Sequence, residues 1–403
     1  MGRSPVDSPG RLPDGERIKA QAYALGFDLA GITRLGPAST FPSFERWLSQ
    51  GLAGEMAWLR RDAALRRDTR LPHRGARSAI VVALDYGGRQ PPGTLARYAR
   101  GRDYHVVMKD RLRSLLKWLE TEAGTAVSGR PYVDTAPILE RDLARQAGLG
   151  WFGKNTLLIH PRRGSFLFLG ALFTDLELDP DPPFAEEHCG TCRRCIDACP
   201  TAAIAEEGVL DSTRCISYLT IEKRGTIPIE WRRSIGTLVY GCDICQDVCP
   251  WNVRFASEAR DPELTTGSLE GSPDHVELLR MDSAGFQRRF GGTAVTRAGR
   301  QGLSRNAAVA LGNRGAPGDV EALAECLTSE PDPVVRAHAA WALGAIGTRD
   351  ALEALHLRST TETDDVVAAE IDAAVQPRTL DPEIGVRLEL PNRPGTGSDA
   401  TLG

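Results

Sequence analysis

Eight of the nine cysteines in this 403-residue sequence fall between positions 189 and 249, and their spacing has a chemical meaning. The stretch CGTCRRCIDACP places Cys189, Cys192, Cys195 and Cys199 in the pattern C-x2-C-x2-C-x3-C-P. In bacterial ferredoxins this pattern supplies three thiolates to one 4Fe-4S cluster, and the fourth thiolate crosses to a second cluster. The spacing therefore predicts iron–sulfur centres that carry single electrons.

A second run, CDICQDVCP, lacks one ligand. Val239 occupies the position of its first expected cysteine, and Cys215, which lies between the two runs, can supply the missing thiolate. Zinc is the alternative, because C-x2-C pairs also suit tetrahedral zinc, but zinc requires neither the Cys-Pro ends nor a crossed ligand. The expected ligands are Cys189, Cys192, Cys195 and Cys249 for one cluster, and Cys199, Cys215, Cys242 and Cys245 for the other.

The composition limits the class of protein that holds these clusters. Lys and Arg total 49 against 53 Asp and Glu, a net charge of −4, which excludes a uniformly basic coat but not a local basic patch. No apolar run approaches the ~18 residues of a membrane helix, and the first residues contain no apolar signal segment. We expect a cytoplasmic protein of about two to four domains with no membrane part. Clustered cysteines in such a protein indicate metal rather than disulfides.

Several elements are expected to position this chemistry. Apolar spacing predicts a helix from about residue 16, a strand after the turn GFDLAGIT, a buried strand over 78–86 and a helix over 104–122. Residues 155–178 contain two apolar runs around a Pro-Arg-Arg-Gly turn, which predicts a β-hairpin. The Pro-rich segment 179–184 is a linker into the cysteine region.

The sequence changes character after about residue 256 and contains an internal repeat. Residues 306–323 align with 338–355 at an offset of 32, and nine of the eighteen positions are identical. Small residues allow helices to stack closely, and the repeated glycines are expected to end the first helix of each pair. This pattern indicates HEAT-like helical pairs, in which Cys326 is an ordinary small core residue.

The order of these motifs resembles one family. PYVDTAPILERDLARQAGLGWFGKNTLLI at 131–159, the double cysteine array, CISYLTIEKRG at 215–225 and the helical pairs together resemble epoxyqueuosine reductases, from about residue 16 to residue 358. The resemblance implies the α+β class. It divides the chain into a flexible N-terminus (1–15), a cobalamin-binding α/β catalytic domain (16–180), a ferredoxin-like domain with two 4Fe-4S clusters (181–255), a C-terminal α-helical HEAT-like repeat domain that binds tRNA (256–376) and a disordered tail (377–403).

The same resemblance implies the activity. Members of the family reduce epoxyqueuosine to queuosine at the wobble position of tRNA, the final step of queuosine biosynthesis, with cobalamin and electrons relayed by two 4Fe-4S clusters. The expected partners are that tRNA and a low-potential electron donor such as ferredoxin or flavodoxin, and the enzyme is expected to be a monomer. The alternative is a reductive dehalogenase-like corrinoid iron–sulfur oxidoreductase, but those proteins usually carry a twin-arginine export signal that this sequence lacks. A simple ferredoxin-like carrier would not explain the roughly 180 residues before the clusters.

Asp134 is the candidate acid. Opening an epoxide to leave an alkene requires two electrons and a proton for the departing oxygen, and a carboxyl group buried near a cofactor can have the raised pKa of a proton donor. From the residues alone, Asp134 is equally well explained as the N-cap of a helix with Pro137 in its first turn. The resemblance to the family's proton donor favours catalysis. His105 lies in a D-x-H-x-x-G-like stretch without the final glycine, so we do not expect it to be an axial ligand of cobalt.

The remaining cobalamin contacts are expected in loops. The turn GWFGKN at 150–155 lets backbone approach a flat ring, although it is equally an ordinary helix-ending turn. The basic loop 97–100 is equally well explained as a solvated surface. The expected cobalamin contacts are Arg97, Tyr98, Asp134, Lys154, Asn155, Ser165, Ser217 and Asp243.

Between residues 283 and 316 there are six arginines and no acidic residue. A segregated positive segment suits RNA phosphates, whereas an ordinary solvated face interleaves both signs. Two further cations beside the cluster region lie where an unstacked wobble base would enter. The expected tRNA contacts are Lys223, Arg224, Arg297, Arg300 and Arg305.

Overall fold

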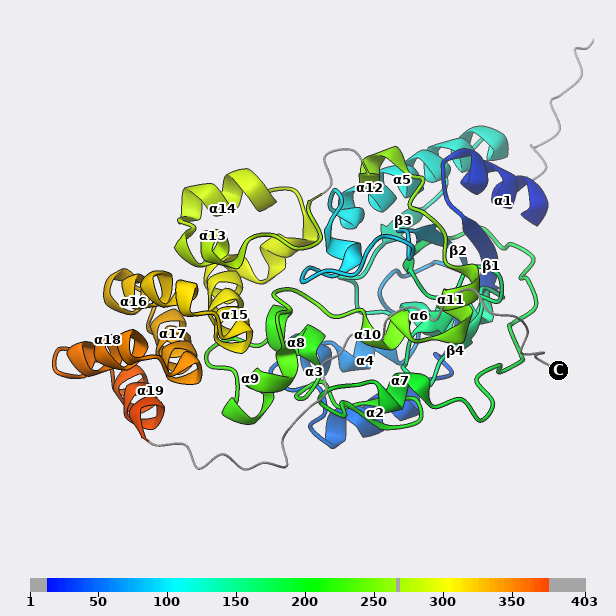
Figure 1. The fold of residues 1–403 in the computed structure, drawn as a ribbon. Helices are drawn as coiled ribbons and strands as arrows, with labels where there is room; N and C mark the ends of the chain where they lie inside the picture. The colour runs from blue at the N-terminus through cyan, green and yellow to red at the C-terminus, as the bar shows by residue number, and fades with distance from the viewer. Residues whose placement is uncertain (1–12, 266–268, 377–403) are drawn as a thin grey trace, which may run out of the picture.

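The computed structural model describes residues 13–265 and 269–376, and the first half of the chain is built on one four-stranded sheet (Figure 1). All strand pairs are antiparallel. The predicted flexible N-terminus, apart from residues 13–15, and the predicted tail lie outside the described residues. The order across the sheet is β1 (Leu29–Arg34), β2 (Ser78–Asp85), β6 (Leu167–Thr174) and β3 (Gly129–Tyr132).

Helices cover both faces of this sheet, so every residue of β2 is buried. Ile80 and Val82 face the core beneath α1 and α5, whereas Ala79 and Val81 face α6 on the other side. Successive residues of a strand point to opposite faces, so this continuous apolar run serves two layers. The helices of this part are α1 (Gly15–Ala24), α2 (Phe41–Ser49), α3 (Ala57–Arg61), α4 (Ala63–Arg66), the 3-10 turn η1 (Arg97–Ala99), α5 (Tyr104–Ala123) and α6 (Glu140–Gln146).

The predicted β-hairpin over 155–178 is wrong. Both apolar runs contain strands, but β5 (Leu158–Ile159) pairs with β4 (Trp151–Phe152), and β6 enters the main sheet between β2 and β3. The turn that joins the runs is tight, with His160 bridged to Gly164. β6 is a mostly buried strand of eight residues, so its backbone is better satisfied by the eight residues of β2 on one side and the four of β3 on the other than by a two-residue strand.

The cysteine segment consists of short helices and one small pair of strands. α7 and α10 each carry one cysteine, Cys195 and Cys245, and the two helices pack against each other. The two cysteine runs are therefore brought side by side. The elements are α7 (Arg194–Asp197), β7 (Ile204–Glu206), β8 (Val209–Leu210), α8 (Ile216–Ile221), α9 (Ile229–Ile235), α10 (Ile244–Asp247) and α11 (Pro250–Phe255).

The last part is an array of stacked helices (Figure 1). Gly315 and Gly347 end the first helices of the two repeats, α15 and α17, with φ angles of 68° and 67°, as the repeat predicts. Among the helices of the described residues, none is both long and apolar enough to cross a membrane. The elements are α12 (Pro262–Thr265), α13 (His275–Arg280), α14 (Ser283–Phe290), η2 (Ala294–Arg297), α15 (Gly299–Arg314), η3 (Pro317–Asp319), α16 (Val320–Ser329), α17 (Pro333–Ile346), α18 (Arg349–Ser359) and α19 (Asp365–Val375).

Hydrophobic packing joins these parts. Ile216 and Leu219 of the cysteine segment share a core with Leu303 of α15. Leu264, beyond the cysteines, packs instead into the core of the N-terminal sheet. The hydrophobic cores therefore extend across the expected domain boundaries, and those boundaries remain predictions.

Candidate functional site

The four thiols expected to hold the first cluster lie together. Burial and the neighbouring thiols of Cys189, Cys249 and Cys192 raise the pKa of Cys195 to about 11. Burial also raises the pKa of Cys249, which has Cys189 and Cys192 as neighbours. Because Cys249 belongs to the second run, the first group draws thiols from both runs.

A second group forms in the same way. Burial, with Cys215 and Cys199 nearby, raises the pKa of Cys242. Burial and the thiols of Cys242, Cys215 and Cys199 raise the pKa of Cys245. Iron binds the thiolate, so cluster assembly must remove these protons.

Each of the two groups consists of four thiols, which is the donor set of a 4Fe-4S cluster. In the part of the chain that the structure describes, no three His, Cys, Asp or Glu side chains come close enough to bind one metal ion. All nine cysteines are free of disulfides. Zinc would need four ligands about 2.3 Å from one point, whereas a 4Fe-4S cluster holds each thiolate on a different iron. The donor chemistry and spacing fit two clusters.

Asp134 lies in the loop between β3 and α6, and its backbone is unusual. Its φ angle is 57°, a left-handed conformation that aspartate tolerates better than most residues. Its backbone N–H donates to the carboxylate of Glu140, the first residue of α6. Helix α6 has Leu139 at its N-cap, so the alternative in which Asp134 caps this helix is wrong. The side chain is 58% exposed.

His105 links this loop to the first turn of α5. Its Nε2 lies 3.2 Å from Asp134 Oδ2, and its Nδ1 lies 2.7 Å from Asp103 Oδ1. Asp103 is the N-cap of α5, and the imidazole stacks on Tyr104 with centroids 4.2 Å apart. Burial opposes the charge on the ring, but the two carboxylates outweigh it and raise the pKa of His105 to about 9. The ring is therefore an imidazolium at neutral pH.

The two carboxyl groups of the loop have opposite pKa shifts. Partial removal of water from around the Asp134 carboxylate opposes its charge, but the hydrogen bond and the charge of His105 outweigh this effect and hold the pKa of Asp134 below its usual range. Burial and the nearby Asp134 carboxylate raise the pKa of Glu140 to about 8. The expected raised pKa of Asp134 is therefore wrong in direction, because an imidazolium lies against this carboxylate. In the free protein the exchangeable proton beside Asp134 is on His105.

Two of the expected cobalamin contacts form a buried ion pair. Arg97 Nη1 lies 3.0 Å from Asp243 Oδ2 and 2.8 Å from Asp247 Oδ1. The backbone N–H of Arg97 also donates to Asp243. The side chains of Arg97 and Asp243 are 3% and 9% exposed. The pair fastens η1 to the second cysteine run, directly after Cys242.

Asn155 and Ser165 reach the same run. Asn155 Nδ2 donates to the carbonyl oxygen of Cys245 at 3.4 Å, and Ser165 Oγ donates to Gln246 Oε1 at 2.9 Å. Lys154 does not join them, because its Nζ donates to the carbonyl of Gly190 and forms an ion pair with Glu207. Lys154 therefore points toward the first cysteine run.

Tyr98 and Ser217 complete the expected set. The ring of Tyr98 lies between those of Tyr104 and Tyr240, with centroids 6.4 Å and 6.1 Å away. Burial raises the pKa of Tyr98, and the negative charge of Asp134 adds to this effect. Ser217 is half-buried in the first turn of α8, two residues after Cys215. The expected contacts other than Lys154 thus come from segments on both sides of the seam between the sheet and the cysteine runs.

One buried donor near the loop has no partner. Among the described residues, Arg66 Nη1 is one of the buried polar atoms without a hydrogen bond. Burial lowers the pKa of Arg66, and the nearby carboxyl groups of Asp62 and Glu140 oppose this effect. Cobalamin carries amide and phosphate oxygens that accept such hydrogen bonds, so the residues present fit the cofactor. Arg66 is therefore a candidate cobalamin-binding residue that the sequence motifs did not indicate.

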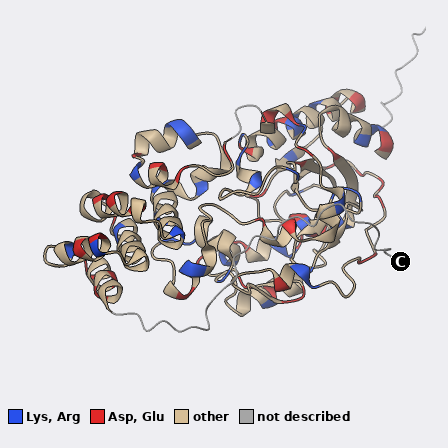
Figure 2. Cartoon of the chain, viewed as in Figure 1, with Lys and Arg blue, Asp and Glu red and all other residues tan. Residues whose placement is uncertain are grey.

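The arginine-rich segment 283–316 is not a free positive surface. Arg297 pairs with Glu222 at 2.8 Å, and Arg300 pairs with Glu330 at 2.7 Å. Figure 2 shows acidic and basic residues side by side on the C-terminal helices. The predicted segregation of charge is wrong, because the neutralising carboxylates come from outside the segment. Two further pairs are Arg289 with Glu277 and Arg314 with Asp319.

Arg305 requires a correction. It is 2% exposed, so it does not present its guanidinium to a phosphate. Its Nη atoms instead donate to three backbone carbonyls that follow Cys215 in the chain, at 2.8–2.9 Å, those of Leu219, Lys223 and Gly225. Arg305 therefore holds the cysteine segment against α15.

The other two expected tRNA contacts lie on the segment that Arg305 holds. Lys223 forms an ion pair with Glu55. Arg224 is exposed, and its guanidinium donates to the backbone carbonyls of Arg297 and Ala298. Both cations are engaged within the protein, and any contact with RNA must compete with these partners.

Three descriptions of protein families match this chain. "Epoxyqueuosine reductase QueG, DUF1730" matches residues 66–135, which include His105 and Asp134. "4Fe-4S double cluster binding domain" matches residues 188–252, and "HEAT repeats" matches residues 294–375. The three matches follow the order of the sheet, the cysteine segment and the helical array.

Relatives match over most of the chain. The epoxyqueuosine reductase of Xanthomonas campestris pv. campestris is 40% identical over 336 residues, which cover 81% of this chain and 94% of that protein. That of Pseudomonas aeruginosa is 40% identical over 351 residues, 84% of this chain and 95% of that protein. A crystal structure of epoxyqueuosine reductase with an epoxyqueuosine-modified tRNA-Tyr stem loop matches with a TM-score of 0.82 at 30% identity, covering 89% of this chain and 97% of that one.

Proposed function

The chain belongs to the epoxyqueuosine reductase family, and from that premise we propose that it reduces epoxyqueuosine to queuosine in tRNA. It is an oxidoreductase that uses two 4Fe-4S clusters and cobalamin. The observation that carries the proposal is the agreement over most of the chain with relatives of that activity. The alternative of a reductive dehalogenase is not favoured, because the match includes the helical repeats as well as the sheet and the cysteine segment.

The overall reaction sets what the protein must supply. Converting an epoxide into an alkene and water consumes two electrons and two protons. The clusters would supply the electrons one at a time, and cobalamin, when bound, would supply a low-valent cobalt centre. The protein itself must hold the substrate, exclude water and deliver a proton to the departing oxygen.

We propose that Asp134 delivers this proton, with His105 as its source. An alkoxide is a poor leaving group until it is protonated, and a positioned acid typically contributes ~100 to 10,000-fold. The Asp134 carboxylate and the His105 imidazolium hold one mobile proton between them, 3.2 Å apart. The second carboxylate, Asp103, keeps the imidazole oriented through Nδ1.

The cluster ligands are proposed in the crossed arrangement. Cys189, Cys192, Cys195 and Cys249 hold one cluster, and Cys199, Cys215, Cys242 and Cys245 hold the other; the two groups of neighbouring thiols support this assignment. Cys215→Ala is the sharpest test, since Cys215 lies outside both runs. Iron content should fall towards four atoms per chain, as expected for one 4Fe-4S cluster, and turnover should cease. Retention of both clusters would refute the crossed assignment, and Cys326→Ala is the matched control.

The proposed partners follow from the substrate. We propose a tRNA that carries epoxyqueuosine in its anticodon, a low-potential donor such as ferredoxin or flavodoxin, and a monomer working in the cytoplasm, where thiols and tRNA are both available. The decisive experiment reconstitutes the protein with iron, sulfide and cobalamin, adds a chemical reductant and epoxyqueuosine tRNA, and identifies the nucleosides by mass spectrometry. Queuosine should form; its absence with fully loaded protein would refute the function.

A further inference from the structure

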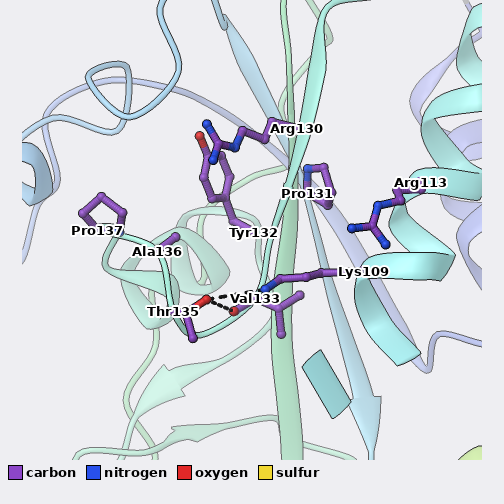
Figure 3. A pocket seen from close by; sticks show the side chains of 9 residues that line it. All are labelled: Lys109, Arg113, Arg130, Pro131, Tyr132, Val133, Thr135, Ala136 and Pro137. Carbon is purple, nitrogen blue, oxygen red and sulfur yellow. Dashed lines mark hydrogen bonds between the residues drawn. The ribbon is translucent and has the colours of Figure 1, made fainter. Parts of the chain in front are cut away.

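A cavity of about 390 Å³ lies beside the loop that carries Asp134 (Figure 3). Its walls come from α5, β3 and the residues on either side of Asp134. None of its lining residues comes from the cysteine segment, and none is among the expected cobalamin or tRNA contacts. The cavity is therefore separate from the site described above but shares its loop.

One face of α5 leads from Asp134 to this cavity. His105, Lys109 and Arg113 are four residues apart, so they lie on one face of the helix at intervals of about 6 Å. His105 contacts Asp134, and Lys109 Nζ donates to Thr135 Oγ1 at 3.4 Å. The loop thus runs along this face, with the acid against one end and the cavity against the other.

The cavity has positive charge that the protein leaves partly unneutralised. In the described part of the chain, Lys109 and Arg130 have no carboxylate within ion-pair distance. The guanidinium of Arg130 lies over the ring of Tyr132, 5.4 Å from its centroid. Arg113 pairs with Asp110 at 2.6 Å on the exposed side of α5. Five of the six arginines of 283–316 are ion-paired or buried, whereas neither Lys109 nor Arg130 is ion-paired in the described part of the chain.

We propose that this cavity binds a phosphate of the tRNA backbone near the modified nucleotide. The inference rests on the proposed function, because it takes the substrate to be RNA. The ammonium group of Lys109 and the guanidinium group of Arg130 line one cavity from opposite faces of the edge strand β3, and such groups suit a phosphate. A phosphate bound by both at the outer edge of β3 would join α5 to β3 beside Thr135. Substrate binding would then steady the loop that presents Asp134. An acidic electron-donor protein is less well suited, since the cavity has no wall from the cluster segment.

The test is the salt dependence of tRNA binding by the double variant Lys109→Gln/Arg130→Gln, in protein loaded with both clusters and cobalamin. Loss of one phosphate contact should weaken binding of epoxyqueuosine tRNA about tenfold at low salt and lower the slope of log Kd against log salt by about 0.7. Lys109→Arg/Arg130→Lys keeps both charges and should retain most of the slope. Arg46→Gln/Lys117→Gln removes the same charge from exposed positions and should leave the slope close to that of the wild type.

The outcomes separate this inference from the proposed function. If the wild-type protein forms no queuosine, the function itself fails. If the wild type forms queuosine and the Lys109→Gln/Arg130→Gln variant binds tRNA with the wild-type slope, the phosphate site is refuted and the function stands. If the slope is unchanged but reduction by an acidic donor protein slows, the cavity is a protein-docking site, and the RNA proposal is equally refuted.

Discussion

Two polar networks in this molecule have opposite character. Around Asp134, two carboxylates flank one imidazole, a third carboxyl has its pKa raised to about 8, and the backbone is left-handed at the residue that matters most. Around Arg305, a guanidinium is buried among backbone carbonyls that satisfy it. The first network shares protons between groups of shifted pKa, so it can exchange them. The second has no group that titrates near neutral pH, so it can only hold structure.

The helical repeats sharpen this contrast. Asn306 and His338 occupy equivalent positions in the two repeats, and both bind backbone of the cysteine segment. Asn306 Nδ2 donates to the carbonyls of Thr220 and Val239, and His338 Nε2 accepts from the N–H of Ile227. Burial lowers the pKa of His338, so it stays a neutral acceptor. The inner helices of the repeats therefore serve as a scaffold for the segment that follows Cys215.

The largest effect is expected at the first network. Asp134→Asn keeps the shape of the side chain but removes the carboxylate that is proposed to take a proton from His105 and pass it to the substrate, so single-turnover queuosine formation by pre-reduced enzyme should fall by ~100 to 10,000-fold. Binding of tRNA and cobalamin and the melting temperature should stay close to wild type, because Asn tolerates the left-handed backbone as well as Asp does. Near-normal turnover would show that Asp134 does not deliver the proton. The network around Asp134 would then be structural, like the network around Arg305.

The second network should respond in stability. Arg305→Met keeps most of the side-chain volume but leaves three buried carbonyls without their donor, which should cost on the order of 3 kcal/mol of unfolding free energy. The measurement is chemical denaturation of the iron-loaded protein. The substitution should leave the salt slope of tRNA binding unchanged. A reduced slope with normal stability would show that Arg305 contacts RNA after all.

The protonation of His105 predicts a pH dependence. Its folded pKa of about 9 lies above the ordinary value near 6.5, so its stabilising contribution is complete below about pH 6.5 and is lost as the pH rises through 9. The single-turnover rate should fall above pH 9 for the same reason. Asp103→Asn removes one of the two supporting carboxylates and should move this alkaline limb to lower pH. The position of the His105 ring resonances in NMR titrations checks the assignment, and an unmoved limb in the variant would contradict it.

The parts that the sequence predicted are those encoded by local spacing. The thiol groups follow from cysteine intervals, and the ends of α15 and α17 follow from glycines that must adopt a left-handed backbone. Charge pairing could not be predicted in this way. The carboxylates that neutralise Arg297 and Arg300 lie 75 and 30 residues away in sequence, so a count of arginines within one segment gave the wrong surface.

The site was predicted in part for the same physical reason. Asp134 stands in a recognisable motif, but its pKa depends on His105, which lies 29 residues earlier in the sequence and meets it only in the fold. The Asp-x-His stretch at the start of α5 argued only against an axial cobalt ligand, and it did not indicate that His105 contacts Asp134. The predicted β-hairpin was wrong for a similar reason. Burial across the whole sheet determines which strands pair with β6, and the nearest turn in the sequence does not.

The smallest expected effect is at Arg297, which lies between the two networks. It is half exposed, pairs with Glu222 and lies over the ring of Trp58, and an exposed ion pair contributes less than about 1 kcal/mol. Arg297→Gln should therefore shift the melting temperature only slightly. The positive charge of Arg297 also favours the ionised form of Asp134, so the variant should raise the pKa of that carboxyl. Glu222→Gln is the informative counterpart, because it frees Arg297 without removing it. If Arg297 contacts RNA, Glu222→Gln should tighten tRNA binding at low salt, and Arg297→Gln should weaken it. If both variants bind tRNA with the same affinity, Arg297 acts only on Asp134 and on the loop around it.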